Sequence, residues 1–160
     1  NMGVVWAYGN AISAPYSEQF YVGGANSIRA FNVRSIGPGR YHAQTSYLSY
    51  LDQTGDLKLQ MNLEYRPRMF GNLYGALFLD AGNVWTLRSD SDRPGAVFKP
   101  KNMFKEMAVG TGIGIRYDLD FFVLRLDWGV GLHLPYKNGF YNFDKFKDSQ
   151  SLHFAIGYPF

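Results

Sequence analysis

Apolar and polar residues alternate one by one along several stretches of this chain. In the clearest stretch, from Leu57 to Arg66, every second residue is apolar and each residue between them is charged or an amide. A period of two residues places the two classes of side chain on opposite faces of a β-strand. The alternation recurs over residues 73–80, 108–117, 122–132 and 152–160. A further strand over residues 4–12, whose facing is ambiguous, makes six predicted strands.

Apolar and polar residues alternate in the strands of both a soluble sandwich and a membrane barrel, so alternation alone does not decide between them. The lengths of the strands and loops do. A tilted strand needs about nine to eleven residues to cross a bilayer, whereas soluble strands average roughly five to six. Long and short connectors also alternate, as they do between the two rims of an outer-membrane barrel. The long ones are residues 14–56, 86–106 and 135–150, and the short ones are 67–72 and 119–121. We therefore predict an all-β fold, an antiparallel transmembrane β-barrel.

Composition supports this prediction. Aromatic residues make up 18% of the chain and charged residues only 18%, against about 25% charged residues in a soluble domain. Aromatic side chains gather at the ends of the predicted strands, where the membrane interface binds them. Examples are Tyr65, Trp85, Tyr117 and Phe121.

Several classes of function are not expected. The chain has no cysteine, which removes disulfides and thiolate sites. The net charge of +3 comes from basic residues interleaved with acids, so nucleic-acid binding is not indicated. His42, His133 and His153 lack metal-ligand spacing. The glycines of residues 110–114 lie in a strand with no following helix, so we reject a phosphate loop. We predict no catalytic residue, no cofactor and no metal.

The predicted strands are too few for a closed barrel, since the smallest single-chain ones use about eight. Residues 1–6 also read like the inside of a strand, so we expect the chain to begin in mid-structure. An open strand edge in lipid leaves backbone groups unsatisfied, at several kcal/mol each. We expect the chain to be part of a larger barrel, and the isolated fragment to be able to oligomerise through its open edges.

One loop segment carries a motif. Gly23 and Gly24 are followed by Ile28-Arg29-Ala30-Phe31. Taken alone, this is an ordinary exposed loop with a solvated arginine. The segment resembles the conserved loop of the BamA/TamA superfamily of outer-membrane assembly and translocation barrels, also called bacterial surface antigens. That loop reads Gly-Gly, two or three residues, then Val-Arg-Gly-Phe or Val-Arg-Gly-Tyr, so Ala30 replaces a glycine.

Further segments resemble the same family in the same order. Residues 78–85 are similar to its Phe-x-Asp-x-Gly-x-Val-Trp strand, and residues 153–160 resemble its terminal strand in Bacteroidetes-type bacteria. The resemblance covers the whole chain. It implies that residues 1–160 are the C-terminal part of the barrel domain, holding the last six of sixteen strands. It also implies that the loop of about residues 14–56 enters the lumen.

The resemblance implies two groups of site residues. In the first, a loop latch, Arg29 meets Asp80, with Glu64 as a second candidate. The alternation independently places Glu64 and Asp80 on the polar face. A purely structural salt bridge is the alternative role. The latch group is Gly23, Gly24, Arg29, Phe31, Glu64 and Asp80. The second group, a terminal-strand signal, is Phe154, Ile156, Gly157, Tyr158 and Phe160.

The implied function is insertion of β-barrel proteins into the bacterial outer membrane, or movement of polypeptides across it. In the family, a substrate strand adds at the seam between the first and last strands, and an edge strand is a natural template for this. Expected partners are outer-membrane lipid, nascent outer-membrane proteins and accessory assembly proteins. Two alternatives remain open. The barrel could anchor a patatin-like lipase domain outside this chain, or it could be a simple porin or adhesin.

Overall fold

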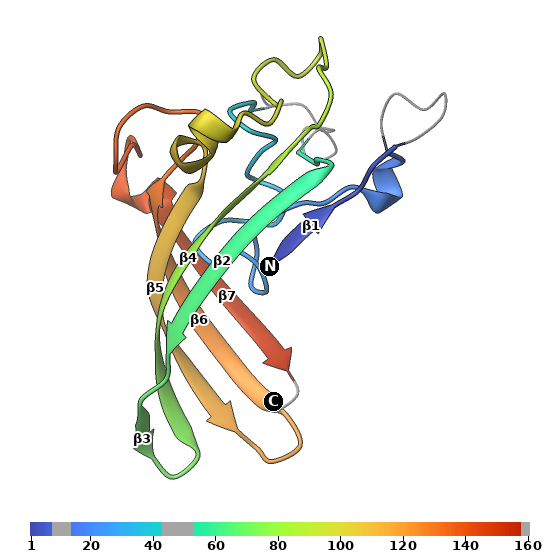
Figure 1. Cartoon of the computed structure of the whole chain (residues 1–160). Helices are drawn as coiled ribbons and strands as arrows, with labels where there is room; N and C mark the ends of the chain where they lie inside the picture. The colour runs from blue at the N-terminus through green and yellow to red at the C-terminus, as the bar shows by residue number, and fades with distance from the viewer. Residues whose placement is uncertain (8–13, 43–52, 158–160) are drawn as a thin grey trace.

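A computed structural model describes residues 1–7, 14–42 and 53–157. Their strands form one antiparallel sheet in the order β1-β2-β4-β5-β6-β7, with β3 paired to β4 (Figure 1). The strands are β1 (Met2–Val4), β2 (Leu57–Tyr65), β3 (Arg68–Phe70), β4 (Leu73–Trp85), β5 (Ala108–Asp118), β6 (Val123–His133) and β7 (Gln150–Gly157). Three short 3-10 helices lie between them, namely η1 (Tyr16–Glu18), η2 (Pro100–Lys105) and η3 (Phe146–Ser149). The predicted all-β antiparallel fold is confirmed.

The sheet has seven strands where the sequence predicted six. The additional strand, β3, lies in the short connector 67–72, where Arg68 pairs with Tyr74 and Phe70 with Leu73. Gly71 closes this hairpin with a φ of 52°, which glycine adopts without steric cost. The N-terminal strand ends at Val4. Residues 8–12 of the stretch predicted there lie outside the described residues.

The two faces of the sheet carry opposite chemistry. On the outward face, large apolar side chains are exposed, and Leu63 of β2 is 70% exposed. The others include Met61, Leu77, Ile113, Ile115, Trp128, Leu152, Phe154 and Ile156. On the inward face, Asp80 and Asp127 are fully buried. A sheet that buries its charges and exposes its apolar residues suits a barrel in lipid.

The two ends of the sheet differ as well. The β3–β4 hairpin and the turn between β5 and β6 lie at one end, and the long connectors 86–107 and 134–149 lie at the other (Figure 1). Among the described residues, no helix is long and apolar enough to cross a membrane.

At the long-loop end, the connector 86–107 folds over the outward face. Trp85 is fully buried there with Leu57 and Met107, and its ring meets Phe98 edge-on at 5.4 Å between centroids. The expectation that Trp85 belongs to an interface girdle is therefore wrong. Alternation gives the facing of a side chain but not what a connector places over it.

The inward face holds the main apolar core. Part of the first long loop packs there against the upper ends of β4, β5 and β6, and Val22, Ile28 and Ile36 are fully buried. The outermost strands in the pairing order, β1 and β7, do not pair with each other, so the sheet is open.

Candidate functional site

The loop segment Gly23–Phe31 forms a closed turn on the inward face. The Gly24 N–H donates to the Phe31 carbonyl at 2.8 Å, and the Gly23 N–H donates to the Ser27 hydroxyl at 3.2 Å. Gly23 has a φ of 102°, and a Cβ there would lie 2.0 Å from the carbonyl oxygen of Asn32. The position therefore requires glycine, both for its backbone conformation and for the space.

The turn aims Arg29 at Asp80 of β4. Arg29 Nε donates to Asp80 Oδ2 at 2.8 Å and Nη2 donates to Oδ1 at 2.8 Å, which is a bidentate pair. The Arg29 backbone N–H adds a third bond to Oδ2 at 3.0 Å. The exposed fraction of the Arg29 side chain is 5% and that of Asp80 is 0%. Burial strengthens such charge-assisted bonds and makes the loss of either partner costly.

A second carboxylate extends the contact to three further strands. Glu64 of β2 pairs with Arg29 Nη1 and lies 3.3 Å from Nη2 of Arg116 on β5. Arg116 Nη1 lies 2.6 Å from Asp127 Oδ1 on β6. Charges from the loop, β2, β4, β5 and β6 therefore form one continuous chain, which we call the inward-face ionic network.

Amide and hydroxyl groups complete the hydrogen bonding around Asp80. Asn62 Nδ2 donates to Asp80 Oδ1 at 2.8 Å and to the Ser27 carbonyl at 2.7 Å. Ser27 Oγ donates to Gln60 Oε1 at 2.9 Å, and Gln60 Nε2 donates to Asn62 Oδ1 at 2.6 Å. Ser27, Gln60 and Asp80 are buried and have partners, as buried polar groups require, whereas Asn62 is exposed.

Apolar contacts shield the Arg29–Asp80 pair from water. The Arg29 guanidinium lies over the Phe78 ring, 3.9 Å from its centroid, within the range of a cation–π interaction. Phe31 is 6% exposed and stacks on Phe143, with 6.2 Å between ring centroids. These contacts place the ion pair in the desolvated regime, where removal of one partner costs about 3–5 kcal/mol.

The loop lies directly on glycines of the barrel wall. A Cβ at Gly110 of β5 would lie 2.2 Å from the Ala30 methyl group. A Cβ at Gly129 of β6 would lie 2.6 Å from the carbonyl oxygen of Arg29. These two wall positions allow backbone-to-backbone approach, and Ala30 occupies the remaining space.

The structure brings all six residues of the latch group to one place. In the terminal-strand group, Phe154 and Ile156 are exposed on the outward face of β7, and Gly157 ends the strand. Tyr158 and Phe160 lie outside the described residues. Sequence reasoning missed Arg116, Asp127 and Arg125, whose Nη2 donates to the Ala25 carbonyl at 3.1 Å. The sequence feature that could have identified them is a charged residue on the polar face of an alternating strand.

A metal or cofactor site is not evident in the described part of the chain. No group of three or more histidine, aspartate or glutamate side chains in residues 1–7, 14–42 and 53–157 is arranged to hold a metal ion. The carboxylates of the inward-face ionic network are engaged by arginines. The arrangement holds the loop and strands β2, β4, β5 and β6 together.

Comparisons with known proteins agree with this description. The domain model described as the Omp85 superfamily domain matches residues 1–160. Over 96 residues, the chain is 30% identical to outer membrane protein assembly factor BamA of Neisseria meningitidis serogroup B, covering 57% of this chain and 12% of that protein. Over 77 residues, it is 39% identical to the human sorting and assembly machinery component 50 homolog, covering 44% of this chain and 15% of that protein.

A solved structure shows the same fold. CdiB from Acinetobacter baumannii superposes with a TM-score of 0.51 at 21% sequence identity, covering 94% of this chain and 22% of that chain. The chain thus spans less than a quarter of the length of each of these relatives.

Proposed function

Because the chain belongs to the Omp85 superfamily, whose BamA/TamA-type motifs it carries, we propose that it forms part of the wall of a factor that inserts β-barrel proteins into the outer membrane. Members of this superfamily mediate outer-membrane protein assembly or polypeptide transport, and the bacterial outer membrane is the location of this barrel. The exposed apolar face of the sheet is accordingly the face toward lipid.

One observation carries the proposal, the position of β7 as an outermost strand of the sheet among the described residues. This strand pairs with β6 along its whole length, from the pair Gln150–Val130 to the pair Gly157–Val123. Among the described residues, no strand pairs with its other edge. Its side chains alternate between exposed and half-buried along its length. A free edge presents N–H and C=O groups that an incoming strand can pair with. A substrate strand added there would place its apolar residues toward lipid.

The inward-face ionic network supports the same proposal from the other side of the wall. It joins the loop to β2, β4, β5 and β6 but includes no residue of β7. We propose that this latch keeps the wall in register while the β7 edge is free to exchange partners.

We further propose that residues 1–160 are the C-terminal part of a larger barrel domain, with the loop of about residues 14–56 reaching into its lumen. The open sheet supports this, because the outermost strands β1 and β7 leave their outer edges without partners among the described residues. Closing the barrel with further strands removes the cost of several kcal/mol for each unpaired backbone group in lipid.

The latch is tested with Arg29→Ala in the full-length protein. We expect the barrel to lose its resistance to heat on semi-native gels and to assemble other outer-membrane proteins more slowly. Arg34→Ala is the matched control, since it removes from the same loop a cation that lies over the rings of Tyr16 and Tyr21 and has no part in the inward-face ionic network. If Arg29→Ala behaves as wild type in both assays, the latch proposal is wrong.

The edge template is tested by crosslinking. Single cysteines along β7 should form disulfides with cysteines in the last strand of a stalled substrate, in one fixed register. The matched positions are on β5, which is flanked by β4 and β6 and should not crosslink. Equal yields from β5 and β7, or no product from β7, would contradict insertion at this edge.

A further inference from the structure

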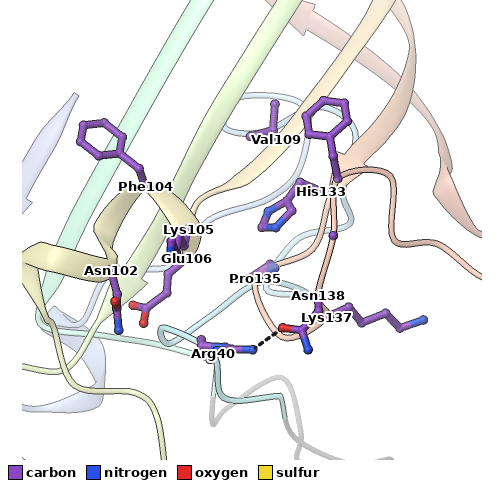
Figure 2. A pocket seen from close by; sticks show the side chains of 12 residues that line it. Arg40, Asn102, Phe104, Lys105, Glu106, Val109, His133, Pro135, Lys137 and Asn138 are labelled. Atoms are coloured by element: carbon purple, nitrogen blue, oxygen red, sulfur yellow. Dashed lines mark hydrogen bonds between the residues drawn. The ribbon is translucent and has the colours of Figure 1, made fainter.

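A cavity of about 520 Å³ opens at the long-loop end of the sheet. Its walls are η2, the segment 135–140 and Arg40 of the first long loop, beside the start of β5 and the end of β6 (Figure 2). No residue of the latch group lines it, and the cavity is therefore separate from the candidate site described above.

The cavity lies on the outward side of the wall. Val109 lines it and has the same facing as Ile113 and Ile115, which are 52% and 48% exposed on the lipid side. His133, the cross-strand partner of Val109, lines it too.

The rim of the cavity carries two exposed aromatic side chains. Phe104 of η2 and Phe140 of the opposite segment line the cavity and are 78% and 70% exposed. Large apolar side chains at the rim of a membrane barrel lie in the interface between headgroups and acyl chains. The cavity therefore sits where a lipid changes from polar to apolar.

The depth of the cavity in the membrane follows from the lengths of the loops around it. Outer-membrane barrels place tight turns on the periplasmic side and long loops on the outer side. The cavity is at the long-loop end, beside the first residues of the eleven-residue strand β5. A tilted strand of this length spans the hydrocarbon core, so the cavity lies at the headgroups of the outer leaflet.

The lining is predominantly cationic. Arg40, Lys105 and Lys137 contribute positive charges, against one carboxylate, Glu106. Arg40 is held in place because its Nη2 donates to Asn138 Oδ1 at 3.1 Å, the dashed line in Figure 2.

The carboxylate of Glu106 is engaged in a hydrogen bond outside the cavity. Its Oε2 accepts the indole N–H of buried Trp85 at 2.8 Å, which commits it to the apolar cluster behind the cavity. Lys137 is paired at 2.6 Å with Asp144, but the Asp144 side chain is 81% exposed. Such a surface pair is weak, so an anion can compete for the lysine.

We propose that this cavity binds the phosphate group of a phosphorylated outer-leaflet lipid. Arg40, Lys105 and Lys137 contact the phosphate, since guanidinium and ammonium groups are the usual phosphate ligands in proteins. Phe104 and Phe140 contact the first methylene groups of the acyl chains. The cations alone would fit any phosphate, and the exposed aromatic rim on the lipid side selects a lipid.

Binding is measured with the full-length protein in detergent by native mass spectrometry. The probes are bisphosphorylated lipid A, the same lipid after enzymatic dephosphorylation, and inorganic phosphate as a competitor. We expect lipid A to bind at least ten-fold more tightly than the dephosphorylated lipid, and millimolar phosphate not to displace it.

The variant R40Q/K105Q/K137Q should weaken lipid A binding at least ten-fold. The matched control is K101Q/K145Q/K147Q, which removes the same charge from exposed positions outside the cavity lining, in the two loops that hold Lys105 and Lys137. Semi-native gels show that each variant is folded, and Lys105→Gln alone is the fallback if the triple variant is not. Equal loss in both triple variants, equal binding of the dephosphorylated lipid, or displacement by phosphate would each overturn the proposal.

Discussion

Adding one methyl group at Gly110 should push the Arg29 loop off the barrel wall. A Cβ at this position would lie 2.2 Å from the Cβ of Ala30, whereas two carbon atoms in contact are about 3.5–4.0 Å apart. The Ala30 methyl group is attached directly to the loop backbone and has no rotamer that avoids the clash. Either the loop or strand β5 must therefore move by more than about 1 Å.

The magnitude combines the cost of overpacking, a gain in backbone entropy and strain on the bonds of Arg29. Overpacking a well-packed site costs about 1–3 kcal/mol, and replacing a strand glycine by alanine returns about 0.5–1 kcal/mol of backbone entropy. Movement of the loop also strains the bidentate bonds of the neighbouring Arg29 to Asp80. We expect Gly110→Ala to lower the free energy of unfolding by about 1–3 kcal/mol.

A second substitution should rescue the first. Ala30→Gly alone loses one buried methyl group, about 0.8 kcal/mol, and gains unfolded-state entropy worth about 0.4–1 kcal/mol. In the double variant, the nearest atoms to the new Cβ would be the Val130 carbonyl oxygen at 3.4 Å and the Ala30 Cα at 3.6 Å. Since the clash disappears, the double variant should be more stable than the sum of the two single changes by about 1–3 kcal/mol.

The assay is urea unfolding of the full-length protein in lipid vesicles, followed by tryptophan fluorescence and checked by mobility on semi-native gels. Gly75→Ala is the matched control, because a Cβ there meets only Met69 and Pro67 side-chain atoms at 3.6–3.9 Å. That variant should be neutral or slightly stabilised. Additivity of Ala30→Gly and Gly110→Ala within about 0.5 kcal/mol would refute the contact between loop and wall.

Three further changes probe other parts of the wall by the same unfolding assay. Asp127→Asn should cost about 3 kcal/mol, because it leaves the 4%-exposed side chain of Arg116 without its nearest carboxylate; a loss below about 1 kcal/mol would mean the pair is solvated. Trp85→Phe should cost about 1–3 kcal/mol, since the buried Glu106 loses its indole donor, and wild-type stability would exclude that bond. Phe154→Arg, on the outward face of β7, should cost up to about 2–4 kcal/mol in lipid and far less in a soluble environment, so equal stability in both would contradict its facing.

The alternation of the sequence predicted the faces of the sheet well. It placed Glu64 and Asp80 on the polar side, and the structure has both on the inward face with Arg29 between them. The partner of Arg29 itself came from the family resemblance, because a loop residue has no periodicity that gives its facing. The Omp85 match confirms that family.

The pairing of Arg116 with Asp127 could not be predicted in the same way. Arg116 lies opposite Arg125, and Asp127 lies opposite Gly114, so the ion pair is diagonal across β5 and β6. Diagonal contacts depend on register, and sliding a strand by two residues keeps every side chain on its face. The alternation pattern is the same before and after such a slip, so it could not predict that Arg116 and Asp127 form a pair.

Because the alternation of apolar and polar residues does not change when a strand slips by two residues, it does not fix the register of the strands. The inward-face ionic network can fix it. Apolar residues on the outward face contact fluid lipid and tolerate a slip, since each still faces lipid afterwards. Ion pairs across strands do not tolerate it, because Arg116 would lose Asp127 and Glu64 would lose Arg29. Buried ion pairs contribute little net stability compared with apolar packing, but they can select one arrangement among several. Under the proposed insertion at the β7 edge, this selection would keep the rest of the wall in register, since the network lies in β2, β4, β5 and β6 and includes no residue of β7.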